Sequence, residues 1–539
     1  MIKKAFEAVI QDRMLFVLSA VSGAMVFLMA QGVGFTMGPD GDEYLTAAFE
    51  LFNPRKYGNP TDYIAPFYPA FLRLLFAMGG GWAFRIFHHF LPAFAVPLIV
   101  YFSLKSFSRS AAFLAGLFIA LDVNSMFHFT TICSEGPYIL GLSLVLFSFC
   151  RLLQNPQNPW WAYGHGLSIA ALALIRAAGR YLFFALLPLD VLTFRSWAIL
   201  RRMCVGFFAF LIVVSLMLTS VPFLKFPNML VPLTFLRSGG MVHPDNVPLH
   251  RLADLTEQAY FEHPLPEKGR QLFWEDMLKG EGEATGMMLY LCWLEHSDEF
   301  NRLVNASLGE AVRGLSKDNL IKIKKIYKKG MKFHSEVVPV SMIYPNLFSY
   351  DGKRVAEDTK QSITARLTRY ADRYGAPVRS SLAAKFYQKY CQIDYSDFYR
   401  DQPRPWATRW LVRISIIFPF FVSRWVCFLA VIVMMLTGGR EGLSKYRLVV
   451  VFGMILYLCN FTMTMLFGPH ERYRAPMDMF YFLPAAWLYA FLIFDKNWKN
   501  PWKWIGVGLL PVFVWLNFLL CSPEITNYVM DNPFLRFGS

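Results

Sequence analysis

Long apolar segments alternate with short polar connectors along most of this 539-residue chain, and one long polar region interrupts the series. Segments of this length match the hydrocarbon thickness of a bilayer, and only helices with fully bonded backbones cross it in such a pattern. The pattern therefore predicts an all-α polytopic membrane protein with about eleven transmembrane helices. The predicted segments lie near residues 14–35, 83–104, 110–127, 133–152, 164–175, 178–194, 203–222, 411–436, 447–468, 475–494 and 502–521.

The long polar region divides the chain into three parts. Residues 1–222 form an N-terminal transmembrane module, 223–408 a soluble and mainly helical insertion, and 409–539 a C-terminal transmembrane module. Within the first part, the loop 36–80 carries apolar residues at helical spacing, such as Leu45, Ala48, Phe49 and Phe52. That spacing predicts helices that lie in the membrane interface.

The basic residues predict the orientation of the bundle. The formal net charge is +15, but the Lys and Arg residues gather in short connectors between apolar segments. This placement follows the positive-inside rule and excludes a nucleic-acid partner as its explanation. With a cytoplasmic N-terminus, each cytoplasmic connector is net basic, and the loop 36–80 and the insertion face outward. We expect a multi-pass protein of the plasma membrane, most simply a bacterial inner membrane, with extracytoplasmic chemistry.

Three carboxylates follow the first apolar segment, at Asp40, Asp42 and Glu43. Carboxylates at the mouth of a membrane bundle are costly to desolvate, which makes them candidates for a functional site. The structural alternative is a helix start, because Asp40 and Glu43 have the spacing of a capping box. The two interpretations are compatible, since a capping carboxylate can also face a cavity.

Two expected outward connectors are basic and break the positive-inside rule. Each lies at the end of an apolar segment, where a cation needs a partner. One explanation is pairing with lipid headgroups or with the carboxylates above; the other is an anionic substrate, because guanidinium binds phosphate through two parallel hydrogen bonds. The residues concerned are Arg176, Arg180, His470, Arg472 and Arg474, with Glu471 beside them.

Glu135 begins another apolar segment on the expected outer side. A carboxylate in the first helical turn is favoured by the helix dipole, and Pro137 near that turn supports a helix start there. The functional alternative brings Glu135 into the same outer cavity as Asp40.

These stretches together resemble GT-C membrane glycosyltransferases, and in particular the branch of protein mannosyltransferases and aminoarabinose lipid A transferases. The motifs occur in the family's order over residues 1–194 and 445–495, and the insertion is not matched. Ala177 departs from the proline that follows the arginine in the family. The matching stretches are Pro39–Tyr44, Ala65–Pro69, Thr131–Tyr138, Ala173–Arg176 and Glu471–Pro476.

The resemblance implies transfer of a sugar from a polyprenyl-phosphate donor to a hydroxyl of a lipid, glycan or protein acceptor, within the membrane and outside the cytoplasm. Asp40 then takes the role of general base in a single inverting displacement, with Glu135 as second carboxylate; Asp42 and Glu43 stay open as alternative bases. The basic residues Arg176, Arg180, His470, Arg472 and Arg474 would hold the donor phosphate, and Tyr44, Tyr68 and Tyr473 would line the cavity. No cofactor is expected; Mg or Mn on Asp40 and Glu135 stays open.

A transporter or flippase for an anionic lipid-linked substrate is the rival interpretation, because charges inside a bundle also mark transport paths. Transporters often carry internal repeats and charges at the midplane. This chain shows no repeat, and its charges gather toward one face, which favours the transferase.

Overall fold

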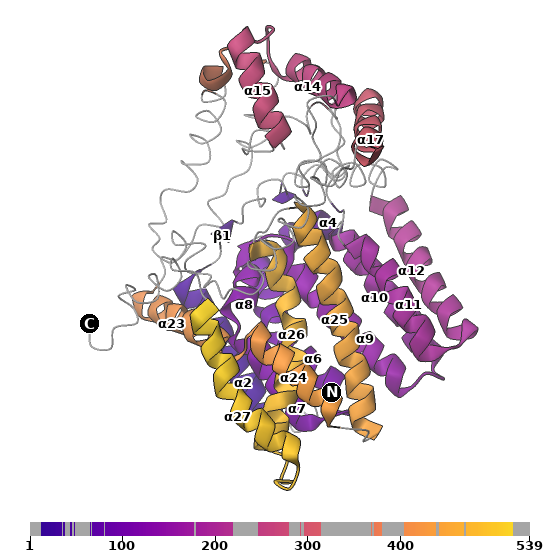
Figure 1. Cartoon of the computed structure of the whole chain (residues 1–539), viewed down its shortest axis with the longest axis vertical. Helices are drawn as coiled ribbons and strands as arrows, with labels where there is room; N and C mark the ends of the chain where they lie inside the picture. The colour runs from indigo at the N-terminus through magenta and orange to yellow at the C-terminus, as the bar shows by residue number, and fades with distance from the viewer. Residues whose placement is uncertain are drawn as a thin grey trace.

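The computed structural model is a helical bundle with a smaller group of helices at one end (Figure 1). The structure describes most of both transmembrane modules and part of the insertion. These segments are residues 12–34, 36–37, 44–45, 48, 65, 67–79, 81–176, 179–218, 246–279, 292, 296–313, 368, 371–379, 404–437, 441–467 and 471–520.

Helices follow one another along both transmembrane modules. In the first they are α2 (Arg13–Gly32), α4 (Phe67–Gly79), α5 (Gly81–Ala83), the π-helix η2 (Phe84–Phe90), α6 (Leu91–Leu104), α7 (Arg109–Leu121), α8 (Val123–Thr130), α9 (Glu135–Gln154), α10 (Pro159–Ile175), α11 (Gly179–Phe194) and α12 (Trp197–Leu218). In the second they are α23 (Pro405–Phe421), α24 (Arg424–Leu436), α25 (Glu441–Phe467), α26 (Glu471–Ile493) and α27 (Pro501–Leu520).

The length and composition of the described helices support a helical membrane protein. Six of them are long and apolar enough to cross a bilayer, and seven if the bent pair α7–α8 forms one span. Helices also occupy the other predicted segments, but several of these are too short or too polar to pass the same test. The predicted number of about eleven crossings is therefore not confirmed.

The two ends of the bundle are distinguished by the connectors that they carry. At the end where α12 leads into the insertion, here called the insertion end, lie the starts of α9 and α11. The opposite end, here called the far end, holds the connection between α26 and α27 (Figure 1). Connectors at the far end carry Lys105, Arg109, Arg151, Arg195, Arg201, Arg202, Lys445, Lys496, Lys499 and Lys503.

A polar contact fixes the helix starts at the far end. Asp12 caps α2, and its carboxylate accepts from Arg109 at 2.6 Å and from the Tyr101 hydroxyl at 2.7 Å. Burial alone would raise the pKa of Asp12, but the hydrogen bonds from Arg109 and Tyr101 outweigh it and hold that pKa below its ordinary value. The pair joins the start of α2 to the start of α7.

The segment predicted as one helix over 110–127 is broken. Helices α7 and α8 meet at an angle of 57°. Asp122 sits at the break with extended backbone dihedrals, and its carboxylate accepts from the backbone and hydroxyl of Ser125. The side chain therefore caps a new helix start inside an apolar region, which turns α8 toward the insertion end.

The described part of the insertion contains α14 (Val247–Tyr260), α15 (Glu267–Lys279) and α17 (Ser297–Arg313). Two buried carboxylates organise it: Glu257 accepts a bidentate pair from Arg270, and Asp276 accepts from Arg373 and the Tyr374 hydroxyl. These helices lie beyond the insertion end of the bundle (Figure 1).

Helices α10 and α12 pack closely because a glycine on each helix faces the backbone of the other. A Cβ on Gly166 would lie 2.0 Å from the carbonyl oxygen of Met203, and one on Gly206 would lie 2.4 Å from that of Tyr163. Small residues allow such close helix approach in membranes. Gly164, on the same helix α10, has open space around it.

We expect Gly166→Val to push α10 and α12 apart and to destabilise the protein by about 1–3 kcal/mol, because the obstructing atom is backbone. Thermal unfolding of the detergent-purified protein measures the effect. Gly164→Val is the matched control, since it carries the same change of helix propensity without a clash. Equal melting temperatures for the two variants would contradict the packing assigned to Gly166.

Candidate functional site

A short parallel strand pair begins the site at the insertion end. Strand β1 (Thr36–Met37) pairs with β2 (Thr131–Ile132), with Thr36 opposite Thr131 and Met37 opposite Ile132. The pair joins the start of the loop 36–80 to the connector between α8 and α9. It was not predicted from the sequence, and it brings two segments 95 residues apart in the chain into register.

Two tyrosines of the loop 36–80 connect it to the same region. The Tyr44 hydroxyl donates to Ser134 Oγ at 2.9 Å, and the Tyr68 ring packs edge-on against the Tyr44 ring at 4.8 Å. His88 on η2 donates from Nδ1 to the carbonyl of Phe129 at 3.3 Å, because a carbonyl can only accept. Its Nε2 then accepts from the buried Tyr68 hydroxyl at 2.9 Å.

Glu135 and Arg176 form an ion pair at the centre of this region. The Arg176 Nη2 lies 3.1 Å from the Glu135 Oε1, and their side chains are only 17% and 4% exposed. Glu135 occupies the first turn of α9, where the dipole favours a carboxylate, and Arg176 follows the last residue of α10. The guanidinium also lies over the Tyr138 ring at 5.9 Å.

The partner of Arg176 differs from those considered from the sequence. These were lipid headgroups and the carboxylates of the acidic stretch, whereas the structure pairs Arg176 with Glu135.

A second buried ion pair was missed by the sequence analysis. Arg424 at the start of α24 lies 3.2 Å from Asp478 on α26, with side chains 17% and 1% exposed. The guanidinium sits between the rings of Tyr457 and Tyr481, at 5.9 and 5.6 Å. The available signal was a carboxylate inside one apolar segment and arginines inside another, which marks paired or functional positions.

One set of side chains near the first pair has metal-binding character. His128, Cys133 and Glu135 are all buried, and their ligand atoms lie within 4.8 Å of one another. A nitrogen, a sulfur and one carboxylate suit Zn²⁺ better than the Mg or Mn considered from the sequence, which prefer oxygen ligands. Burial raises the pKa of the Cys133 thiol, so a metal would have to displace its proton.

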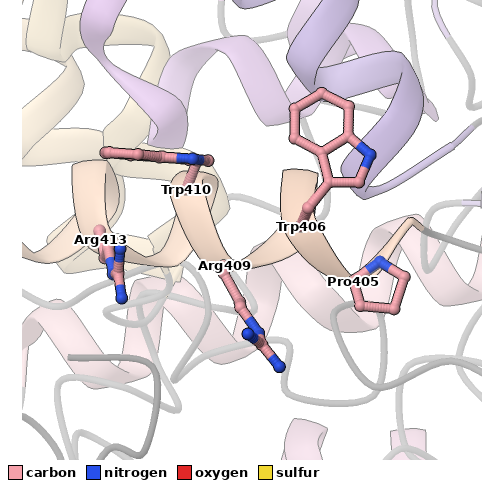
Figure 2. A pocket seen from close by; sticks show the side chains of 5 residues that line it. All are labelled: Pro405, Trp406, Arg409, Trp410 and Arg413. Carbon is pink, nitrogen blue, oxygen red and sulfur yellow. The ribbon is translucent and has the colours of Figure 1, made fainter. Parts of the chain in front are cut away.

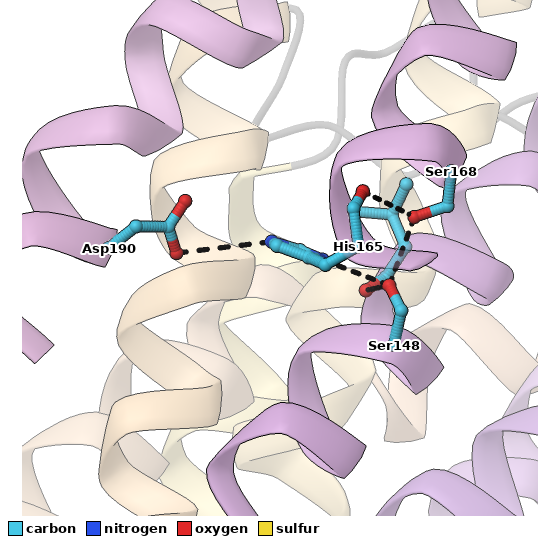
Figure 3. A network of polar contacts seen from close by, with 5 residues as sticks. Ser148, His165, Ser168 and Asp190 are labelled. Carbon is cyan, nitrogen blue, oxygen red and sulfur yellow. Dashed lines mark hydrogen bonds and ion pairs between the residues drawn. The ribbon is translucent and has the colours of Figure 1, made fainter. Parts of the chain in front are cut away.

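Another polar network lies deeper and does not belong to this site. Ser148 Oγ is 2.9 Å from His165 Nδ1, and His165 Nε2 is 3.9 Å from Asp190 Oδ1, on α9, α10 and α11 (Figure 3). Ser148 follows Glu135 by 13 residues on α9, which corresponds to about 20 Å along the axis. The residue types are those of a catalytic triad. Because all three side chains are buried, we interpret the network as a contact among three helices.

The other predicted site residues are only partly covered by the structure. Of the set, Glu135, Arg176, Tyr44 and Tyr68 are described, and all four lie in the contacts above. Asp40, Asp42, Glu43 and His470 lie outside the described residues, as do the side chains of Arg180, Arg472, Tyr473 and Arg474.

Chemically, the described part offers an arginine that can bind an anion, a carboxylate beside it, and a polar connector fixed by two strands and two tyrosines. A search against family models finds none that matches this chain, and a search of curated proteins finds no significant relative. The resemblance to GT-C glycosyltransferases therefore depends on the motifs alone.

Proposed function

We propose that this protein is an integral-membrane glycosyltransferase that moves a sugar from a polyprenyl-phosphate donor to an acceptor hydroxyl on the extracytoplasmic face. The buried Glu135–Arg176 pair carries the proposal, because it provides a cation for the donor phosphate and a carboxylate for the acceptor within one contact. The acceptor is a lipid, glycan or protein.

The geometry around the strand pair supports a role for Asp40 in the same reaction. Asp40 follows β1 by three residues, as Glu135 follows β2 by three residues, and the two strands pair in register. Four residues after Asp40, Tyr44 contacts Ser134, the neighbour of Glu135. In the sequence, Asp40 is only three residues from β1 and four from Tyr44, which supports assigning it to the same reaction as Glu135.

In the proposed reaction, Asp40 accepts the proton of the acceptor hydroxyl as that oxygen bonds to the anomeric carbon. The bond between this carbon and the phosphate oxygen breaks on the opposite face, and the phosphate leaves with the electron pair. Because phosphate is a stable anion, the leaving group needs charge stabilisation from arginine and no strong general acid. A single displacement inverts the anomeric centre, unlike the two-step scheme of retaining hydrolases.

The basic residues of α26 extend the anion-binding side of the site. Helix α26 begins at Glu471 and includes the positions of Arg472 and Arg474 in its first turn. Asp478 lies one turn after Arg474 on the same helix, and its pairing with Arg424 orients the face of α26 next to α24. We assign Arg472 and Arg474 to the donor phosphate together with Arg176 and Arg180.

Sugar transfer by membranes that contain the protein tests the proposal. Wild-type membranes given labelled polyprenyl-phosphate sugars should transfer the label to an endogenous acceptor, with inversion at the anomeric carbon. Membranes from cells without the protein are the control. Transfer from no donor in a series of sugars, or retention of configuration, would contradict the proposal.

One observation favours a different class of function. The pair Arg424–Asp478 lies inside apolar helices, where charges can mark the path of a transported anion. The same labelled donor separates the two functions. A flippase moves it intact from one leaflet to the other, whereas the transferase separates its sugar from its phosphate.

A further inference from the structure

The end of α8 and the start of α9 lie in close contact on either side of β2. Helix α8 ends at Thr130, β2 covers Thr131–Ile132, and α9 begins at Glu135. A Cβ on Gly136 would lie 2.7 Å from the carbonyl oxygen of His128, so the glycine at this position allows the approach. The connector therefore brings the last turn of α8 against the first turn of α9.

Three side chains with metal-ligand atoms meet at this junction. His128 is in the last turn of α8, Cys133 follows β2, and Glu135 begins α9. All three are buried, and their ligand atoms lie within 4.8 Å of one another. The Cys133 Sγ is 3.9 Å from the His128 Nδ1. The junction thus gathers a thiol, an imidazole and a carboxylate away from water.

These separations approach those of a zinc site. Zinc bonds of about 2.3 Å to sulfur and about 2.0–2.2 Å to nitrogen or oxygen, at tetrahedral angles, place the ligand atoms about 3.3–3.6 Å apart. The distance of 3.9 Å between Cys133 and His128 exceeds that range by only a few tenths of an ångström. Movements of about 1 Å bring the most widely spaced ligand atoms into the same range.

The partners that these side chains already have are compatible with a metal ion. Glu135 pairs with Arg176, but a carboxylate has two oxygens and about four lone-pair sites, so an arginine and a metal ion can bind it together. A metal takes one ring nitrogen of His128, and the other nitrogen of a zinc-bound histidine usually keeps a hydrogen-bond partner. The Cys133 Sγ lies 3.0 Å from the Thr131 hydroxyl, which can donate to a zinc-bound thiolate.

We propose that His128, Cys133 and Glu135 bind a zinc ion that joins α8 to α9. The thiolate and the imidazole select zinc over magnesium or manganese, which prefer oxygen ligands. The thiol proton is released to solvent as the zinc–sulfur bond forms, so the thiolate and the carboxylate supply two negative charges for the divalent ion. The proposal goes beyond the transferase, because zinc binding can be measured without a donor or an acceptor.

An open groove of about 490 Å³ on α23 has the opposite chemistry. Figure 2 shows its lining, which contains two guanidinium groups and no carboxylate, thiol or imidazole. Cationic side chains repel a metal ion, so this groove does not compete for zinc. The lining residues are Pro405, Trp406, Arg409, Trp410 and Arg413.

The experiment measures zinc in the full chain, purified in detergent without a histidine tag, loaded with zinc and then desalted. We expect wild type to retain a single zinc ion per chain. Cys133→Ser and His128→Gln should each lose at least about tenfold in zinc affinity, since loss of a group that only supports a ligand already costs about 10–100-fold. Cobalt in place of zinc should give wild type a sulfur-to-cobalt charge-transfer absorption, which requires a bound thiolate.

Cys150→Ser is the matched control, because Cys150 is also a buried cysteine, on α9 and outside the cluster. It should retain zinc and the cobalt absorption as wild type does. Equal zinc retention in Cys133→Ser would indicate an adventitious ion only and would overturn the proposal. Loss of zinc from wild type on desalting, or cobalt binding without the thiolate absorption, would overturn it as well. Because the cobalt spectrum is recorded on wild type, the test remains decisive if a variant does not fold.

Discussion

Arg176→Ala is expected to lower the free energy of unfolding by about 3–5 kcal/mol, because it leaves the buried Glu135 carboxylate without its counter-charge. Glu135 is only 4% exposed in its side chain, so water cannot replace the lost guanidinium. The loss also includes the contact of Arg176 with the Tyr138 ring. Thermal or steric-trap unfolding of the purified protein measures the change.

The double variant Glu135→Gln/Arg176→Met should recover most of this stability, because replacing both partners of a buried pair is often neutral. Arg302→Ala is the control, since Arg302 also pairs with a glutamate, Glu299, but both side chains are exposed to at least half of their area. An exposed pair contributes about 0.2–1 kcal/mol at most. If Arg176→Ala and Arg302→Ala unfold alike, the buried pair does not stabilise the fold.

The double variant also separates stability from chemistry. A protein that regains its stability but transfers no sugar would show that the pair serves the reaction. A protein that regains both would show that Glu135 and Arg176 are structural, as the helix-start alternative for Glu135 requires.

The apolar segments predicted the positions of helices, because each helix must bury or expose an apolar surface along its own length. The 178–194 and 502–521 segments correspond to α11 and α27, although both are only among the shorter apolar helices. The break at Asp122 was missed, although a carboxylate next to Ser125 is a typical helix cap. Hydropathy is averaged over a window of residues, so one capping carboxylate changes it little. The apolar residues on both sides then still match the pattern of one long span.

The site was harder to predict because its contacts connect distant parts of the chain. The sequence marked Glu135 and Arg176 as charges at the ends of apolar segments, but their mutual pairing depends on how α9 packs on α10. The pairing of β1 with β2 has only two residues per strand and no periodicity to detect. Asp478 was read as part of an apolar segment, since hydropathy averages over a window and dilutes one carboxylate.

The contact between Glu135 and Arg176 bears on which carboxylate acts as the general base. Glu135 is held against Arg176, so its carboxylate is already engaged by a guanidinium. This contact is consistent with the proposed role of Glu135 as hydrogen-bond partner of the acceptor. In the proposed reaction the general base comes from the acidic stretch, where Asp40 has the register of the family motif.

Asp40→Asn is accordingly expected to reduce the rate of sugar transfer by about 10²–10⁴-fold, because the amide cannot accept the hydroxyl proton. Binding of the polyprenyl-phosphate donor should persist, since the donor phosphate depends on arginines. Arg474→Ala should show the opposite pattern, with weakened donor binding. Transfer of labelled donor and donor binding, both measured at matched protein levels, resolve the two effects.

Asp42→Asn and Glu43→Gln are the controls for Asp40→Asn, because they remove the same charge from the same stretch. Both should keep transfer within about tenfold of wild type if Asp40 is the base, since a general base contributes more than that. If Asp40→Asn transfers at the wild-type rate while one of the controls fails, the failing residue is the base and Asp40 only caps a helix. If all three transfer normally, proton removal falls to Glu135, and the acidic stretch has a structural role.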